Sequence, residues 1–233
     1  MSEEIQGEVL SALLALFVHD LRNPLTALHT NLRYVLELVP ESEADLRGPI
    51  EDCSLSCDGL AALIDNLEWL GELVHPKEPE RTAVPLADVV QEVVEQTASF
   101  ALLHGTELGM APVAGDVTVW TDRRALRAAL GNIVRNSIQH GSAGPVELVL
   151  EREATVARVR VLDVGPALAS ESFELTTSAA GQVNAKRQAG ARYGAGLALL
   201  VAARAAALAG AALRAGAREP TGNEFSLELA VAD

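Results

Sequence analysis

The sequence predicts an α+β protein in which an antiparallel helical hairpin precedes an α/β sandwich. In the first 75 residues, apolar side chains recur at helical spacing over two long stretches. Residues 84–233 instead mix helical periodicity with the alternating pattern of strands. A short segment rich in proline and charge separates the two regions. We therefore expect domains at 1–75 and 84–233, joined by a linker at 76–83.

Two helices form the expected hairpin, from about Glu3 to Val39 and from about Leu46 to Val74. In each helix the apolar residues alternate in steps of three and four, which is the heptad seam of a helix packed along its length. One hairpin cannot bury two such seams, so we expect a homodimer in which two hairpins form a four-helix bundle. The seam residues are Leu14, Val18, Leu21, Leu25, Leu28, Leu32, Val35 and Val39, then Ile50, Cys53, Cys57, Leu60, Ile64, Leu67, Gly71 and Val74.

Both cysteines of the chain, Cys53 and Cys57, fall on the second seam. A metal or redox pair is the alternative, but no histidine accompanies them at ligand spacing. Because a free cysteine behaves as a small apolar residue in a core, we expect both side chains to be buried.

His19 and Asp20 lie beside the first seam, so both side chains are expected to face water. A solvated surface histidine is the simplest interpretation. However, an exposed imidazole is a usable nucleophile near neutral pH, and a neighbouring carboxylate can hold its tautomer or take its proton. Asn23 follows one turn later on the same stripe. Pro24 removes the hydrogen bond to the carbonyl of Asp20, which predicts a bend.

The most informative pattern of the second domain lies in a helix expected after Asp122, a good N-cap. Asn132, Asn136 and His140 recur there at four-residue steps, away from the apolar face. Amide oxygens can hold a magnesium ion together with phosphate oxygens, which makes Asn132 and Asn136 candidate ligands. Ordinary solvated asparagines are the alternative.

Periodicity and turn residues predict the other elements of this domain. A helix beginning with Pro85 is expected to reach about Leu102, and an alanine-rich helix is expected from about Gly194 to Leu208. Residues 167–193 lack apolar periodicity, which indicates a functional lid or disorder. Strands are expected at 107–110 and 117–120, as a pair within 144–164 joined near 153–154, and at 211–217 and 222–229.

Two short motifs with glycine flank the irregular stretch. Asp163 and Gly165 end a strand, a pattern that by itself usually marks a turn. Gly194 and Gly196 begin the alanine-rich helix, where backbone N–H groups and the helix dipole favour an anion. A dinucleotide-binding motif is excluded there because no strand leads directly into it. The stretch between the motifs carries positive charge that could help to hold phosphates, from Lys186, Arg187 and Arg192.

Composition narrows the classes of function. With a formal net charge of -14, the chain is a poor partner for nucleic acid or an anionic membrane surface. It has no apolar run long enough for a membrane span, and its acidic start does not resemble a signal peptide. We therefore expect a cytoplasmic protein without membrane insertion. Its input would come from a separate sensor protein, or the chain is a fragment whose sensor lies elsewhere.

The run HDLRNPL, residues 19–25, resembles the H-box of two-component sensor histidine kinases. The resemblance implies that His19 accepts a phosphoryl group, that Asp20 assists as a base, and that Asn23 helps phosphatase chemistry. It also implies that the hairpin is a dimerisation and histidine-phosphotransfer domain.

The run LGNIVRNSIQHG, residues 130–141, resembles the N-box of the ATP-binding domain in the same family. Asn136 would then hold magnesium, with Asn132 and His140 as further candidate nucleotide contacts. Related ATPases that hydrolyse ATP carry a glutamate at the position of Asn132. Because an amide is a poor general base, transfer to a protein nucleophile is favoured over hydrolysis.

Two further motifs resemble the glycine boxes of this ATP-binding domain. Asp163 and Gly165 resemble the G1 box, in which the aspartate accepts a hydrogen bond from the adenine amino group and the glycine lets backbone approach the ring. Gly194 and Gly196 resemble the G2 box. Each box has lost one glycine, since Ala167 and Ala198 stand where the family usually has that residue.

The resemblance covers nearly the whole chain and implies a histidine kinase core that uses ATP and Mg²⁺. The γ-phosphate would pass to His19 and then to an aspartate in the receiver domain of a response regulator. The nucleotide is expected on the sheet face opposite the helices. The alternative is a histidine phosphotransfer protein or phosphatase whose ATPase-like domain is degenerate. A pure interaction module would leave the H-box unexplained.

Overall fold

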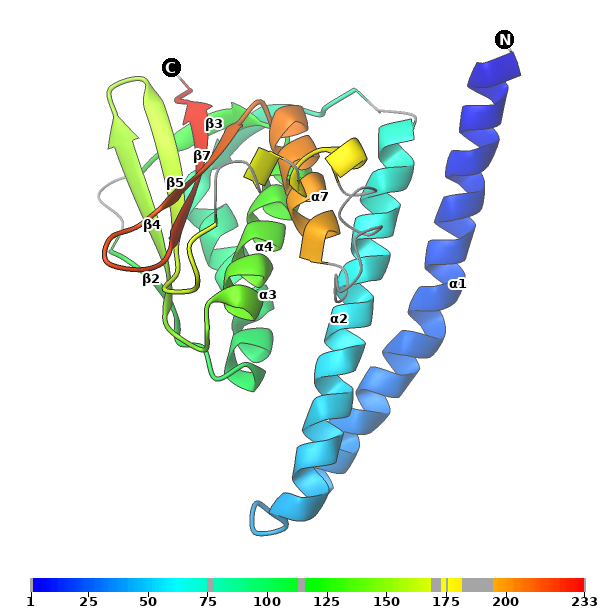
Figure 1. Cartoon of the computed structure of the whole chain (residues 1–233). Helices are drawn as coiled ribbons and strands as arrows, with labels where there is room; N and C mark the ends of the chain where they lie inside the picture. The colour runs from blue at the N-terminus through cyan, green and yellow to red at the C-terminus, as the bar shows by residue number, and fades with distance from the viewer. Residues whose placement is uncertain are drawn as a thin grey trace. The chain divides into compact units, whose positions relative to one another are not determined.

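The computed structural model describes residues 2–74, 78–112, 116–168, 173–174, 176–181 and 195–232. The chain divides into two compact units, Met1–Lys77 and Glu78–Asp233. The predicted α+β architecture is confirmed, because a helical hairpin precedes a unit with a sheet and helices (Figure 1). No helix in the described part of the chain is long and apolar enough to cross a membrane.

The first unit consists of α1 (Ser2–Leu38) and α2 (Ala44–Val74), which run antiparallel (Figure 1). α1 continues through Pro24. At the closed end, Arg47 of α2 donates hydrogen bonds to the carbonyl oxygens of Leu36 at 3.1 Å and Val39 at 2.8 Å. The last carbonyls of a helix lack partners within it, and the last turn of α1 has no basic residue of its own. Arg47 therefore caps α1 from the neighbouring helix.

The two apolar seams are only partly covered within one chain. Val18 and Ile64 are buried, whereas Leu28 and Leu60 each remain 50% exposed. The expectation that both cysteines are buried is right for Cys57 but wrong for Cys53, which is exposed. The physical reason is that α1 covers one side of the α2 seam and leaves the other side open. Burial raises the pKa of the Cys57 thiol, which is therefore neutral at pH 7.

The second unit contains a five-stranded sheet and a separate strand pair. In the sheet, β2 and β4 are parallel and the other neighbours are antiparallel. The strand order is β2 (Leu108–Met110), β4 (Val146–Glu153), β5 (Val156–Leu162), β7 (Asn223–Ala230) and β6 (Ala212–Ala217). The separate pair is β1 (Thr82–Pro85) with β3 (Thr118–Thr121).

Three helices lie on one face of the sheet: α3 (Leu86–Leu103), α4 (Arg123–His140) and α7 (Ala195–Ala209) (Figure 1). α4 begins as predicted, because the side chain of Asp122 accepts a hydrogen bond from the backbone N–H of Ala125 at 2.9 Å. Its apolar face is fully buried, including Leu126, Leu130 and Ile133. The core is therefore built mainly from aliphatic side chains, with Phe100 and Phe225 as buried aromatic residues, in keeping with the low aromatic content of 3%.

The start of this unit differs from the sequence prediction. Pro85 is the last residue of β1 and the N-cap of α3, not the first helical residue. Thr82 and Ala83, which the sequence places in the linker, are strand residues opposite Thr121 and Trp120. In this four-residue strand only Val84 is buried among exposed neighbours, so the sequence has no alternation to reveal it.

Candidate functional site

His19 projects from α1 into solvent, as predicted. Its side chain is 72% exposed and that of Asp20 is 79% exposed. Nδ1 of His19 lies 3.3 Å from Oδ1 of Asp20. A carboxylate in this position favours a proton on Nδ1, which leaves the lone pair on Nε2 for an incoming electrophile. His19 is therefore an accessible nucleophile at Nε2, and the carboxylate of Asp20 lies next to the other ring nitrogen, Nδ1.

Of the residues that follow His19 on α1, Asn23 faces solvent and Arg22 contacts the opposite helix. Asn23 is exposed, and its side chain makes no hydrogen bond to any described residue. Arg22, by contrast, donates from one terminal nitrogen to Oδ1 of Asp65 and to Oε2 of Glu68, both at 2.9 Å. These contacts fix the rotation of α1 against α2 and keep His19 on the open side. Sequence reasoning missed the role of Arg22 because its partners lie 43 and 46 residues away.

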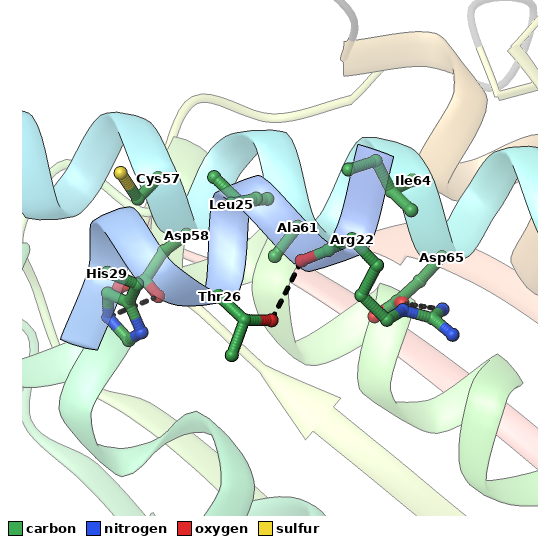
Figure 2. A pocket seen from close by; sticks show the side chains of 9 residues that line it. All are labelled: Arg22, Leu25, Thr26, His29, Cys57, Asp58, Ala61, Ile64 and Asp65. Atoms are coloured by element: carbon green, nitrogen blue, oxygen red, sulfur yellow. Dashed lines mark hydrogen bonds and ion pairs between the residues drawn. The ribbon is translucent and has the colours of Figure 1, made fainter. Parts of the chain in front are cut away.

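A small pocket of about 100 Å³ lies between the helices, next to the ion pair of Arg22 with Asp65 (Figure 2). Nε2 of His29 lies 3.4 Å from Oδ1 of Asp58 across the hairpin. Thr26 donates from its hydroxyl to the carbonyl oxygen of Arg22 at 2.8 Å, as Figure 2 shows. The His29–Asp58 pair and the ion pairs of Arg22 join the two helices at two successive positions along the hairpin. Together they fix the register of α1 against α2.

A second groove on the hairpin is apolar and larger, about 400 Å³ in volume. It lies along the incompletely covered seams, where Leu21, Leu28, Leu60 and Leu63 are exposed in the single chain. Its lining residues are Leu21, Pro24, Leu25, Leu28, Leu60, Leu63, Ile64 and Leu67.

In the second unit, α4 carries the predicted amides on its half-buried side. Nδ2 of Asn132 donates to the carbonyl oxygen of Ala128 at 3.0 Å, so this side chain turns onto its own helix. The side chain of Asn136 has no hydrogen-bond partner among the described residues. Its amide oxygen is therefore available to a ligand or an ion.

His140 ends α4 and remains exposed. The protein atoms around the ring partly desolvate it and lower its pKa, an effect that the negative charge of Asp163 partly opposes. His140 is thus neutral at pH 7. The end of α4 lies against the end of β5, because Gly141 packs beside the side chain of Asp163 and Gly165 packs on the carbonyl oxygen of His140.

Asp163 follows β5 and is only 2% exposed. Its Oδ1 accepts three hydrogen bonds, from the backbone N–H of Gly165 at 2.9 Å, the backbone N–H of Asn223 at 3.2 Å and Nδ2 of Asn223 at 3.0 Å. No described residue donates to Oδ2. One carboxylate oxygen is therefore held by the protein, and the other can accept a hydrogen bond from a ligand.

Glycines allow the loop after β5 to pack directly on α4. A Cβ atom at Gly165 would collide with the carbonyl oxygen of His140. Gly222, with φ at +116°, approaches the carbonyl oxygen of Asp163 from the other side. The predicted role of Gly165 was close approach to a ring, but in this structure its close contact is with the end of α4. This contact places Asp163 beside the helix that carries Asn136.

The uncovered face of the sheet is occupied by ion pairs. Arg160 pairs with Glu224 at 2.7 Å and Glu151 at 2.9 Å, and Glu228 pairs with Arg158 and Arg214. Asn136 and Asp163 lie instead at α4 and at the adjoining end of β5. A ligand that touched both residues would bind on the helical side, and not on the opposite face that we expected from the sequence.

Some predicted site residues cannot be placed. Gly194 and the basic residues Lys186, Arg187 and Arg192 lie outside the described residues. Gly196 lies in the first turn of α7. Of the two positions that lack the expected glycine, Ala167 is exposed in the loop after β5 and Ala198 is half-buried on α7.

Comparison with known proteins supports both halves of this arrangement. Residues 121–233 match the family of histidine kinase-, DNA gyrase B- and HSP90-like ATPases. The chain is 26% identical over 162 residues to the sensor histidine kinase RppB of Synechocystis sp., a match covering 67% of this chain and 35% of that protein. The structure matches full-length ShkA in complex with AMPPNP with a TM-score of 0.63 at 26% identity, over 95% of this chain and 46% of that one. The chain has the architecture of a histidine kinase transmitter core.

The fold also matches a histidine kinase that was solved in complex with a second protein. The histidine kinase ThkA, solved with the response regulator protein TrrA, matches over 99% of this chain and 64% of its own, with a TM-score of 0.57 at 19% identity. The present chain spans about a third of the length of its relative RppB, 35%.

Proposed function

We propose that this transmitter core transfers the γ-phosphate of ATP to His19 and then to an aspartate of a response regulator. The observation that carries the proposal is the geometry at His19, whose exposed imidazole has Nδ1 held by Asp20 and Nε2 open to solvent. In the transfer, the lone pair of Nε2 forms a bond to the γ-phosphorus, the bond from this phosphorus to the bridging oxygen breaks, and ADP leaves. Asp20 takes up the proton that Nδ1 releases.

Two side chains of the second unit, Asp163 and Asn136, have free oxygen atoms that suit a nucleotide and its Mg²⁺ ion. Oδ2 of Asp163 is an acceptor aimed away from the three donors that hold Oδ1, which suits an exocyclic amino group of a base. Asn136 would hold Mg²⁺ through its amide oxygen. Phosphate oxygens of the nucleotide would supply further ligands, because Mg²⁺ is usually held by one or two protein groups together with substrate phosphates.

The catalytic contribution of the protein is mainly positioning. Bound Mg²⁺ neutralises charge on the phosphates, and the chain holds the nucleotide and presents the nucleophile. Asn132 is an amide that already donates to its own helix, so it is a poor base for activating water. We therefore infer that transfer to His19 is favoured over hydrolysis of ATP, and that Asn23 helps in the hydrolytic dephosphorylation of the response regulator.

The proposed partners are a second copy of the chain, a response regulator and a separate sensor. The apolar groove on the hairpin supports the homodimer, because two copies would cover the exposed parts of both seams. The complex of ThkA with TrrA supports a receiver domain as the acceptor. The chain spans 35% of RppB, which is consistent with a sensor outside these residues. The cytoplasmic location stays a prediction.

The alternative is a histidine phosphotransfer protein or phosphatase with a degenerate ATPase-like unit. Ala167 and Ala198, in place of glycines, favour it. Calorimetry with AMPPNP, with and without Mg²⁺, separates the two proposals. Magnesium-dependent binding supports the kinase, and no binding at millimolar nucleotide supports the alternative.

The matched variant is Asp163→Asn, which keeps the shape of the side chain. The donors from Gly165 and Asn223 would hold its amide oxygen at the position of Oδ1, so its NH₂ group would replace Oδ2. A donor would then face the amino group of adenine. We expect this variant to keep its fold and lose nucleotide binding at least about tenfold, the effect of one hydrogen bond to a charged group.

A further inference from the structure

Asn223, the first residue of β7, ties the loop after β5 at three places. Its Nδ2 donates to Oδ1 of Asp163 at 3.0 Å and to the carbonyl oxygen of Pro166 at 3.1 Å. Its Oδ1 accepts from the backbone N–H of Leu168 at 2.6 Å. The backbone of Asn223 also exchanges hydrogen bonds with Asp163, donating to Oδ1 and accepting from the backbone N–H. With only 6% of its surface exposed, the side chain is part of the loop structure.

The orientation of this amide is determined by its partners. The N–H of Leu168 can only donate, so it needs the amide oxygen, whereas the carbonyl of Pro166 can only accept, so it needs the NH₂ group. A flipped amide would lose all three side-chain bonds. Asn223 therefore presents a fixed donor to Asp163, and that donor leaves Oδ2 as the open acceptor.

The two loop residues that Asn223 holds, Pro166 and Leu168, flank Ala167. At this position the motif usually has its second glycine, and the substitution is the main argument for a degenerate site. The structure shows a loop whose shape is set from β7 on both sides of the substituted position. The preceding Gly222 and the guanidinium of Arg218, 3.3 Å from the carbonyl oxygen of Asp163, pack against the same loop.

We propose that Asn223 is the positioning residue of the nucleotide site, and that it makes the site selective for a purine with an amino group at position 6. By occupying Oδ1 of Asp163 it directs Oδ2 to the base, and a carboxylate acceptor rejects the carbonyl of hypoxanthine at the same position. This role rests on the proposed function, because it requires that Asp163 contacts the base.

Two measurements test this role, on the full chain and on Asn223→Ala. The first is hydrogen exchange of the amides of Gly165 and Leu168, which does not depend on nucleotide. We expect both amides to be protected in the wild type and at least about tenfold less protected in the variant, because Leu168 loses its acceptor and Asp163 its fixed position. The second is the ratio of the Kd values for ITP and ATP, which we expect to fall about tenfold in the variant.

Thr121→Val is the matched control, since it removes a buried 2.7 Å hydrogen bond to the carbonyl oxygen of Ala209 without touching the loop. It should lower stability and leave both the loop protection and the base selectivity unchanged. If Asn223→Ala does not fold, Asn223→Ser is measured in the same way, because serine also cannot reach both Pro166 and Leu168.

The outcomes separate this role from the proposed function. Unchanged protection and unchanged selectivity in Asn223→Ala would overturn the role of Asn223, even if the wild type binds ATP. A wild type that binds neither nucleotide would overturn the proposed function and the selectivity, while the exchange experiment would still decide whether Asn223 holds the loop.

Discussion

Nη2 of Arg160 lies 2.7 Å from Oε2 of Glu224, and Nε of Arg160 lies 2.9 Å from Oε1 of the same carboxylate. The pair is bidentate and joins β7 to β5 on the uncovered face of the sheet. This arrangement gives both specificity and strength to a contact between an arginine and a carboxylate. The hydrogen bonds from Arg160 lower the pKa of Glu224 from its usual value of 4.5.

The pair predicts a pH dependence of stability in the second unit. Because the folded pKa of Glu224 is depressed, its contribution is present above pH 4.5 and is lost as the pH falls through the folded pKa. Glu224→Gln should therefore lower the free energy of unfolding by about 1 kcal/mol at pH 7. The difference from the wild type should shrink as the pH falls from 4.5 through the folded pKa, measured by urea unfolding.

Glu147→Gln provides the control, because Glu147 is an exposed strand residue that forms no ion pair with any described residue. It should unfold like the wild type across the whole pH range. A Glu224→Gln variant whose stability deficit does not shrink at all as the pH falls below 4.5 would contradict the assignment.

The exposed seams predict that the chain is an obligate dimer through residues 3–75. Leu63, on the apolar groove, is exposed in the single chain, and a charge there would be buried unpaired in a dimer. Leu63→Glu should weaken the dimer at least about tenfold by sedimentation velocity. Leu102→Glu, at a leucine 79% exposed in the second unit, should have no effect. A wild type that is monomeric at micromolar concentration would rule out the bundle.

Magnesium-dependent nucleotide binding should depend on Asn136. Asn136→Ala removes the proposed ligand and keeps a residue with high helix propensity, so the fold should survive. We expect calorimetry to show the loss of the magnesium-dependent part of the affinity for AMPPNP. Gln139→Ala, at an exposed position of the same helix, should bind normally. Equal affinities for the two variants would remove Asn136 from the site.

The sequence predicts the elements of this protein well where one periodicity extends over many residues. The helices of the hairpin end within about two residues of their predicted bounds, and β5 and β7 follow from strict alternation. β1 was missed because a strand with one buried residue has no pattern. Cys53 was misplaced because heptad spacing identifies an apolar seam but not which part of it one chain can cover.

For the site, the sequence predicts the exposed pair His19 and Asp20 and the amides of α4, which all follow from helical geometry. It cannot predict contacts between distant segments. Asn223 lies 60 residues from Asp163, and nothing in the pattern of β7 sets it apart from a strand residue. Arg22 belongs to the H-box in the sequence, and nothing in that motif predicts that its side chain contacts the opposite helix.

The central claim is that His19 accepts the phosphoryl group. The most direct measurement is incubation of the purified chain with Mg·ATP labelled at the γ-phosphate, followed by a test of acid and alkali stability. We predict acid-labile, alkali-stable label on the wild type and none on His19→Gln, because glutamine keeps polarity and helix propensity but lacks the nucleophile. Asn23→Ala should keep the label and slow dephosphorylation of the regulator. Label that persists in His19→Gln, or a wild type that binds Mg·ATP and never becomes labelled, would contradict the account.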